Sequence, residues 1–242
     1  MSLLTASSIH SDDDAHTRGA SGNLNRLRAA VLGANDGVVS VASIVVGVAG
    51  ATNSKGAIFT AGLAGLVAGA LSMGVGEYVS VSTQRDTERA YIKHEAWELE
   101  TKPEQELAEL AAMYEAKGVS AKTSRQVAHE LTAADALAAH LDIELNINQD
   151  ELTNPWHAAW ASLFSFTAGA LIPLLSIILA PRSLRFAITF VAVIIALIAT
   201  GYLSATAGGA SRRRAVARVV VGGAIAMAVT YLIGHLFGTA VS

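Results

Sequence analysis

Long apolar stretches separated by short polar breaks make up most of the chain. A membrane-spanning helix needs about 20 apolar residues, and five stretches reach that length: 27–50, 57–81, 157–180, 186–210 and 215–237. The break at 53–56 is short, so the first two helices are expected to form an antiparallel hairpin. The pattern predicts an all-α fold, a polytopic membrane protein with five transmembrane helices.

The segment between the second and third apolar stretches differs in kind. It contains fifteen acidic and seven basic residues and no apolar stretch of membrane length. Pro103 suits the first turn of a helix and Gly118 suits a helix end. The pattern therefore predicts three helices, of which the first continues the second membrane helix: 88–99, 103–117 and 120–146.

The chain is accordingly predicted to have four parts. They are a polar N-terminal arm, two transmembrane helices, an acidic helical metal-binding insert and three further transmembrane helices: 1–26, 27–82, 83–154 and 155–242. The first twenty-five residues are polar and lack the apolar region of a signal peptide, so no cleaved signal is expected.

Composition excludes several classes of protein. Hydrophobic residues make up 52% of the chain and charged residues only 15%, against about 25% charged in a soluble domain. Cysteine is absent, which excludes disulfides and thiolate metal sites. No Walker-type phosphate motif, Ser-His-Asp set or zinc signature occurs. We expect neither an enzyme nor an ATP-driven pump, no cofactor and no nucleic-acid partner.

Basic residues in the short loops predict the orientation, because Lys and Arg are enriched on the cytosolic side. The N-terminal arm and the fourth loop share one side and carry seven basic residues, against three on the other side: Arg18, Arg26, Arg28, Arg212, Arg213, Arg214 and Arg218, against Lys55, Arg182 and Arg185. The N-terminus and the insert are therefore predicted to be cytosolic.

Asp36 and Glu77 are the only carboxylates inside the apolar stretches. An acid at the bilayer centre costs roughly 2.5–3.5 kcal/mol on insertion scales, so such residues indicate function. Alternatively, Asn35-Asp36-Gly37 is a turn, but this would leave only thirteen residues for the first span. Glu77 could instead be an interfacial acid near the cytosolic mouth.

Met73 is a third candidate ligand, in addition to these two acids. In an antiparallel hairpin Asp36 and Met73 both lie roughly 12–14 Å below the cytosolic surface, at about 1.5 Å per residue. Glu77 follows Met73 by four residues, so both share a helix face. Two carboxylates with a thioether favour a first-row divalent metal ion over Mg²⁺ or Ca²⁺.

The insert contains further potential ligands at helical spacing. Each pair shares a helix face: Glu95 with Glu98, Glu106 with Glu109, and His140 with Glu144. Carboxylates that face one another across helices are how metal sites in helical bundles are built. The alternative is a solvated acidic face, which charge-rich helices usually show.

With these residues in hand, the chain resembles the vacuolar iron transporter family, including its bacterial members. The resemblance runs from Leu24 to the C-terminus. It rests on residues 28–37, on 62–85 with Ser72-Met73 and Gly76-Glu77-Tyr78-Val79-Ser80, and on Asn154-Pro155-Trp156. It implies five membrane helices, a cytosolic metal-binding domain and a homodimer, which exports Fe²⁺ or Mn²⁺ while protons move the other way.

The resemblance also implies where the metal sites lie. The intramembrane site corresponds to Asp36 and Met73, with Glu77 close by, and the cytosolic glutamates are Glu95, Glu98, Glu106, Glu109 and Glu144. Plant members have a pair of methionines where this chain has His140 and Leu141. Imidazole still binds Fe²⁺ and Mn²⁺, so His140 is kept as a candidate ligand.

We therefore expect an exporter of Fe²⁺ and/or Mn²⁺ that works by proton antiport. It is expected in the cell membrane, or in a vacuolar-type membrane in a eukaryote, with divalent metal ions, protons, the lipid bilayer and a second copy of the chain as partners. The alternative is a membrane-tethered metal buffer or sensor. Asp36 discriminates between them, because a mere anchor gains nothing from a costly buried acid.

Overall fold

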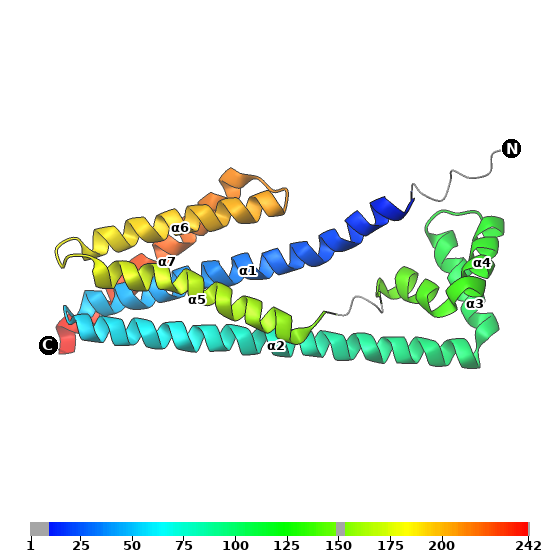
Figure 1. Ribbon diagram of the computed structural model, residues 1–242, viewed down its shortest axis with the longest axis horizontal. Helices are drawn as coiled ribbons and strands as arrows, with labels where there is room; N and C mark the ends of the chain where they lie inside the picture. The colour runs from blue at the N-terminus through cyan, green and yellow to red at the C-terminus, as the bar shows by residue number, and fades with distance from the viewer. Residues whose placement is uncertain (1–9, 149–152, 242) are drawn as a thin grey trace. The chain divides into compact units, whose positions relative to one another are not determined.

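The computed structural model describes residues 10–148 and 153–241, and within these ranges all regular structure is helical. The described residues form seven α-helices, which Figure 1 labels, and a π-helical turn, η1: α1 His10–Ala51, α2 Lys55–Thr101, α3 Pro103–Ala116, α4 Ala121–His140, η1 Leu141–Leu145, α5 Pro155–Leu179, α6 Arg185–Ala207 and α7 Arg212–Val241. The predicted all-α fold is confirmed.

The chain divides into two compact units. One comprises Met1–Tyr78 with Trp156–Ser242, here called the membrane unit, and the other is Val79–Pro155, here called the insert. Helix α2 belongs to both, because it runs unbroken from Lys55 to Thr101. The prediction that the first insert helix continues the second membrane helix is therefore confirmed.

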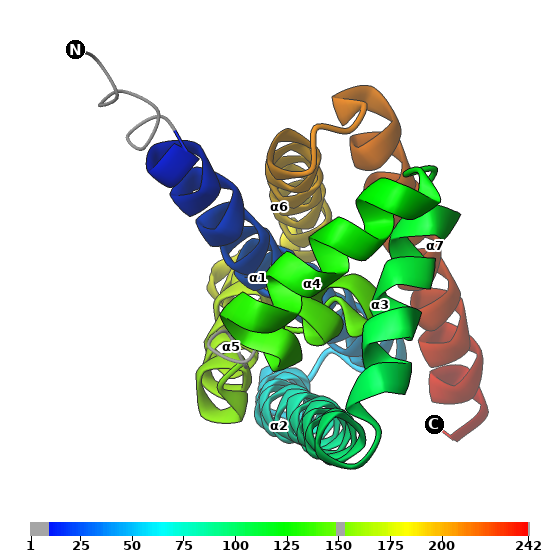
Figure 2. The same cartoon turned by 90° about the vertical axis from the view of Figure 1, so that its right-hand side faces the viewer.

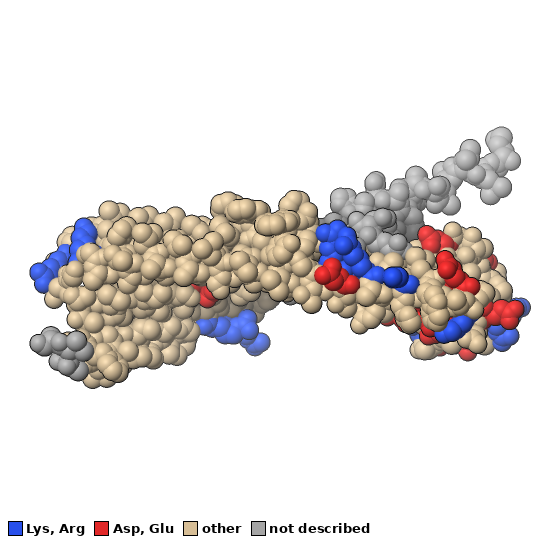
Figure 3. All heavy atoms as spheres, turned by 90° about the horizontal axis from the view of Figure 1, so that it is seen from below, with Lys and Arg blue, Asp and Glu red and all other residues tan. Residues whose placement is uncertain are grey.

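Five segments among the described residues are long and apolar enough to cross a membrane: Ala30–Ala51, Lys55–Thr101, Pro155–Leu179, Arg185–Thr206 and Arg212–Gly238. The protein is thus a multi-pass membrane protein, as predicted. Figure 3 shows uncharged atoms over most of the visible face of the membrane unit, whereas charged atoms gather on the insert. Helix α1 begins at His10, well before the predicted apolar stretch, because a helix satisfies its own backbone and can continue through polar residues.

Helix α1 lies among α5, α6 and α7 in Figure 2, and its valines form the centre of the membrane core. Val38, Val41 and Val45 are fully buried. Glycines allow the neighbouring helices to pack closely against α1. A Cβ on Gly169 of α5 would meet the Ala34 carbonyl, and a Cβ on Gly234 of α7 would meet the Gly47 carbonyl. Backbone therefore packs on backbone on two sides of α1.

The glycine pair in α2 also serves close packing. A Cβ on Gly65 would meet Ile44 of α1, and one on Gly69 would meet the ring of Phe166 of α5. The spacing of one turn places both glycines against neighbouring helices. Helix α2 is thereby fixed against both α1 and α5.

In the insert, α3 and α4 pack on a small core of Leu110, Ala111 and Ala128. Pro103 occupies the first turn of α3, and Gly118 follows the helix with φ +95°. Ser120 caps α4 by accepting a hydrogen bond from the Thr123 N–H. These three signals act as their residue types predict.

The predicted helix 120–146 is not a single α-helix. Asp135 has non-helical angles (φ −161°, ψ 95°), and its side chain accepts a hydrogen bond from the Ala138 N–H at 2.9 Å. An aspartate that caps a new turn in this way breaks the helix before it. The chain restarts, passes His140, and ends as the π-helical turn η1 with Asn146 in the left-handed region.

Candidate metal centre

His140 and Glu95 form the closest pair of potential ligands in the insert. Both side chains are buried, at 0% and 4% exposed. The Nδ1 atom of His140 lies 2.9 Å from Oε1 of Glu95. This is ion-pair distance for a protonated imidazole, but neither atom makes a hydrogen bond with another described residue. Buried polar atoms are normally satisfied, so the two atoms form either an ion pair with each other or a site for a shared cation.

A divalent cation would satisfy both atoms. Imidazole nitrogen and carboxylate oxygen bind first-row metals at about 2.0–2.2 Å, so two such ligands at right angles on one ion are about 3 Å apart. Glu144 is the third candidate ligand, because one atom from each of Glu95, His140 and Glu144 lies within 4.8 Å of the others. The donor set is one nitrogen and two carboxylates.

Three separate elements position this set. Glu95 lies on the part of α2 that belongs to the insert, His140 is the last residue of α4, and Glu144 lies in η1. The break at Asp135 gives the segment with His140 a direction of its own. Single π-helical turns occur often at functional sites, because they shift side chains out of the ordinary helical register.

Glu106 of α3 completes the buried surroundings. Its Oε2 lies 4.0 Å from Nδ1 of His140. Burial raises the pKa of Glu106, and Glu109 and Glu98 raise it further, while His140 and Lys102 lower it. A divalent cation would relieve this crowding of negative charge.

The pKa of Glu95 is also raised, and the shift is large. Burial raises it from 4.5 to about 7, and the charges of Glu144, Glu106, Glu98 and Glu109 add to the effect. All five glutamates predicted for the insert therefore share one electrostatic neighbourhood. The predicted solvated acidic face describes the exposed Glu109 and Glu144, but it does not describe the buried Glu95 and Glu106.

Glu98 is held by two basic residues that the sequence analysis missed. His94 lies 3.3 Å from one carboxylate oxygen, and Lys102 lies 3.1 Å from the other. Lys102 also lies over the ring of Trp97. Both partners are four residues from Glu98, so helical spacing could have revealed them. Glu98 is therefore already paired with basic side chains of its own helix.

The three intramembrane candidates lie in the membrane unit. Asp36 lies within the unbroken helix α1, so the alternative that it forms a turn is wrong. It is half-buried and accepts a hydrogen bond from the Ser40 hydroxyl at 3.1 Å. Met73 packs against the membrane core, and Glu77 is half-buried. No hydrogen bond or ion pair between described residues joins Asp36 to Glu77, so these candidates remain separate side chains.

Comparison with known proteins places this arrangement in a family. A sequence profile of the VIT family matches residues 27–235. The chain belongs to the VIT family. The resemblance noted from the sequence is thereby confirmed, and the match of this VIT family member includes all five membrane spans and the insert.

Individual relatives of this VIT family member support the same assignment. The "Vacuolar iron transporter" of Acanthamoeba castellanii is 44% identical over 90% of this chain and 81% of its own length. "Vacuolar iron transporter homolog 1" of Oryza sativa is 39% identical over 88% of this chain and 74% of its own length. "Vacuolar iron transporter homolog 2.1" of Arabidopsis thaliana is 37% identical over 88% of this chain and 82% of its own length. These names describe transporters, in agreement with the prediction that the chain is not an enzyme.

Proposed function

We propose that this VIT family member carries Fe²⁺ and/or Mn²⁺ across a membrane and out of the cytosol, in exchange for protons. The metal-binding part of the proposal rests on the buried Glu95 and His140 ligand atoms, which lie 2.9 Å apart beside Glu144. The transport part rests on Asp36, which lies inside the unbroken membrane helix α1, where a mere anchor would gain nothing from an acid. The names of these relatives contain the words "vacuolar iron transporter", which supports iron as the cargo.

The donor set suits these cargo ions. Ca²⁺ and Mg²⁺ take oxygen ligands almost exclusively, whereas imidazole nitrogen suits first-row transition metals. The pKa of Glu95, at about 7, lies close to neutral pH. Protons and metal ions therefore compete for the insert within the range of pH found in cells.

In the proposed mechanism the insert binds metal at the cytosolic mouth. Asp36 and Met73 then bind the partly dehydrated ion within the membrane, with Glu77 close by and a second protomer supplying a matching set. A returning proton neutralises Asp36 or Glu77, weakens the site and resets the carrier. The carboxylate of Asp36, held by Ser40, offsets the charge of the desolvated cation.

Location and orientation belong to the proposal as well. We place the N-terminus and the insert in the cytosol, since seven basic residues lie on that side against three on the other. The membrane is the cell membrane, or a vacuolar-type membrane, the location that the names of the relatives give for those proteins.

Purified protein in liposomes tests the proposal. Uptake of Mn²⁺, and of Fe²⁺ without oxygen, should be measured with and without a pH gradient, next to the Asp36→Asn variant. We expect uptake by the wild type that an opposing proton gradient accelerates. Wild-type uptake no faster than that of protein-free liposomes would reject transport. Uptake that is the same with and without the pH gradient would reject antiport alone.

A further inference from the structure

An apolar groove opens on the membrane unit between α1, α6 and α7. Its volume is about 440 Å³, and its walls include Val46, Phe186, Phe190, Met227, Ala228 and Tyr231. This volume lies in the range of about 300–1,000 Å³ that is typical of ligand sites. The aromatic rings of Phe186 and Phe190 remain 39% and 47% exposed, so the groove opens sideways, away from the core.

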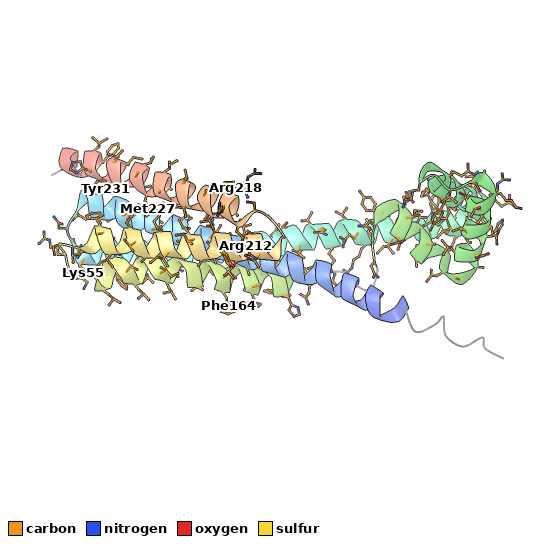
Figure 4. The ribbon with its side chains drawn as sticks, turned by 90° about the horizontal axis from the view of Figure 1, so that it is seen from above. Lys55, Phe164, Arg212, Arg218, Met227 and Tyr231 are labelled. Atoms are coloured by element: carbon orange, nitrogen blue, oxygen red, sulfur yellow. The ribbon has the colours of Figure 1, made fainter. Side chains whose placement is uncertain are left out.

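The groove lies toward one end of the membrane unit. Figure 4 shows Met227 and Tyr231 on α7, with Tyr231 at the end where Lys55 lies and with Arg212 and Arg218 at the other end of that helix. The groove is therefore distant from the basic loop before α7.

Arg185, the first residue of α6, directly precedes Phe186 of the groove wall. It is only 6% exposed. Its Nε is buried without a hydrogen-bond partner among the described residues, and the ion pairs found among them do not include it. A guanidinium whose Nε–H is buried without an acceptor is costly unless an anion pairs with it.

The chain offers few carboxylates for that role. Neither 37–76 nor 152–242 contains an aspartate or glutamate, so the five apolar stretches carry only Asp36 and Glu77. A second copy of the chain would bring the same spans with the same shortage. An anion that pairs with Arg185 in the membrane is therefore best supplied from outside the protein.

The start of α6 strengthens the attraction for an anion. Leu184 precedes the helix and makes no side-chain cap, so the first N–H groups of α6 lack the partner that a cap supplies. The Cα–Cβ bonds of a helix tilt toward its N-terminus, so the side chain of Arg185, the first residue of α6, starts out in the direction of these N–H groups. Free helix N–H groups beside a guanidinium form a strong site for phosphate.

We propose that this corner of the membrane unit binds one anionic phospholipid. Its phosphate contacts Arg185 and the N-terminus of α6, and one of its acyl chains lies in the groove. A free phosphate ion would leave the groove unused, and a neutral hydrocarbon would leave Arg185 unpaired. The combination of a buried cation with an adjoining apolar groove selects a lipid that has both features.

Lipid binding to the full-length protein in a non-ionic detergent tests this. The melting temperature and the lipid adducts seen by native mass spectrometry should be recorded with phosphatidylglycerol, with phosphatidylcholine and with inorganic phosphate. We expect phosphatidylglycerol to raise the melting temperature by several degrees more than the other two and to give a one-to-one adduct.

Three variants locate the site. Arg185→Gln removes the charge and Ala228→Phe fills the groove while it leaves Arg185 in place; each should abolish the preference for phosphatidylglycerol. Arg213→Gln, in the basic loop before α7, is the matched control and should keep it. If Arg185→Gln does not fold, Ala228→Phe alone decides.

Several results would overturn the proposal. Equal effects of the two lipids would remove the anion requirement, and an equal effect of inorganic phosphate would make this a free-anion site. Loss of the preference in Arg213→Gln but not in Arg185→Gln would move it to the other end of α7. A change of oligomeric state in Ala228→Phe, with unchanged lipid binding, would make the groove a protein interface.

Discussion

Nδ1 of His140 and Oε1 of Glu95 lie 2.9 Å apart in a buried position, and no hydrogen bond joins them. Buried polar atoms need a partner, and both an ion pair between the two side chains and a cation bound by both atoms would supply one. The proposed partner is a metal ion, and the pair is accordingly the most informative place to change the protein.

The first prediction concerns His140. His140→Gln keeps a polar side chain but removes the imidazole nitrogen, so Mn²⁺ affinity of the metal-free, full-length protein should fall by roughly tenfold or more, the scale seen even for groups that only support a ligand. Isothermal titration calorimetry in detergent measures this. Glu130→Gln, on the exposed face of α4, is the control. An unchanged affinity in His140→Gln would remove the imidazole from the site.

The second prediction is a dependence of metal binding on pH. The pKa of Glu95 is about 7 without metal, and a carboxylate must lose its proton before it binds an ion. Mn²⁺ affinity should therefore fall as pH decreases through 7, and Glu95→Gln should bind weakly and with a flatter profile. Affinity that stays constant between pH 8 and pH 6 would contradict the role of Glu95.

The same pKa has the opposite effect on the stability of the metal-free insert. An unfolded glutamate has a pKa near 4.5, while folded Glu95 has one of about 7. Between these values the folded state binds more protons, so stability rises as pH falls. Hydrogen exchange at α3 and α4 in the full-length protein, corrected for intrinsic rates, should show greater protection at pH 5.5 than at pH 7.5. Mn²⁺ should reverse this order.

The third prediction concerns the membrane site. Asp36→Asn keeps the shape but removes the charge that offsets a desolvated cation, so flux should fall to the level of protein-free liposomes while the protein still inserts. Met73→Leu keeps volume and removes sulfur, so it should weaken flux less and alter metal preference. Ser40→Ala, which loses only the hydrogen bond to Asp36, should have the smallest effect. Wild-type flux in Asp36→Asn would show that the site is misplaced.

The fourth prediction separates a transporter from a tethered buffer. All five insert glutamates are replaced by glutamine: Glu95, Glu98, Glu106, Glu109 and Glu144. For a transporter the apparent affinity for metal should fall while flux at saturating metal partly survives, because Asp36 and Met73 remain. For a buffer the whole function should disappear, and Asp36→Asn should have no effect. Metal bound per protein and flux across metal concentrations provide the two readouts.

The fifth prediction is the topology. The chain has no cysteine, so single cysteines at Ser54 and Ser120 can be labelled with an impermeant reagent. If the insert is cytosolic, intact cells that display the protein at their surface membrane should label Ser54→Cys and not Ser120→Cys. The reverse result would invert the protein in the membrane and with it the proposed direction of transport.

Hydropathy and turn chemistry were sufficient to predict the five spans and the continuation of α2, since no helix breaker separates the membrane part of that helix from Pro103. They were not sufficient at Asp135. Its neighbours are alanines that favour a helix, and the break there depends on a capping bond that the sequence pattern does not require. The complete burial of His140 could not be predicted either, because the position of this residue depends on the same break at Asp135.

Arg185 is a second case in which packing overruled the pattern. The sequence analysis counted it among the basic residues of a short loop, where Lys and Arg normally contact water. Helix α6 begins at Arg185, however, one residue before the predicted apolar stretch, and the side chain is buried. A shift of one residue at a helix boundary thus changes a solvated charge into an unpaired one.

The glycine contacts of α1 limit how this protein can change shape. Where the Ala34 carbonyl faces Gly169 and the Gly47 carbonyl faces Gly234, no side chain lies between the helices that could change its rotamer. Such joints must slide whole or stay closed. Any alternation between inward-open and outward-open states would therefore either move α1, α5 and α7 together or slide them past one another as rigid helices, without side-chain rearrangement at these contacts.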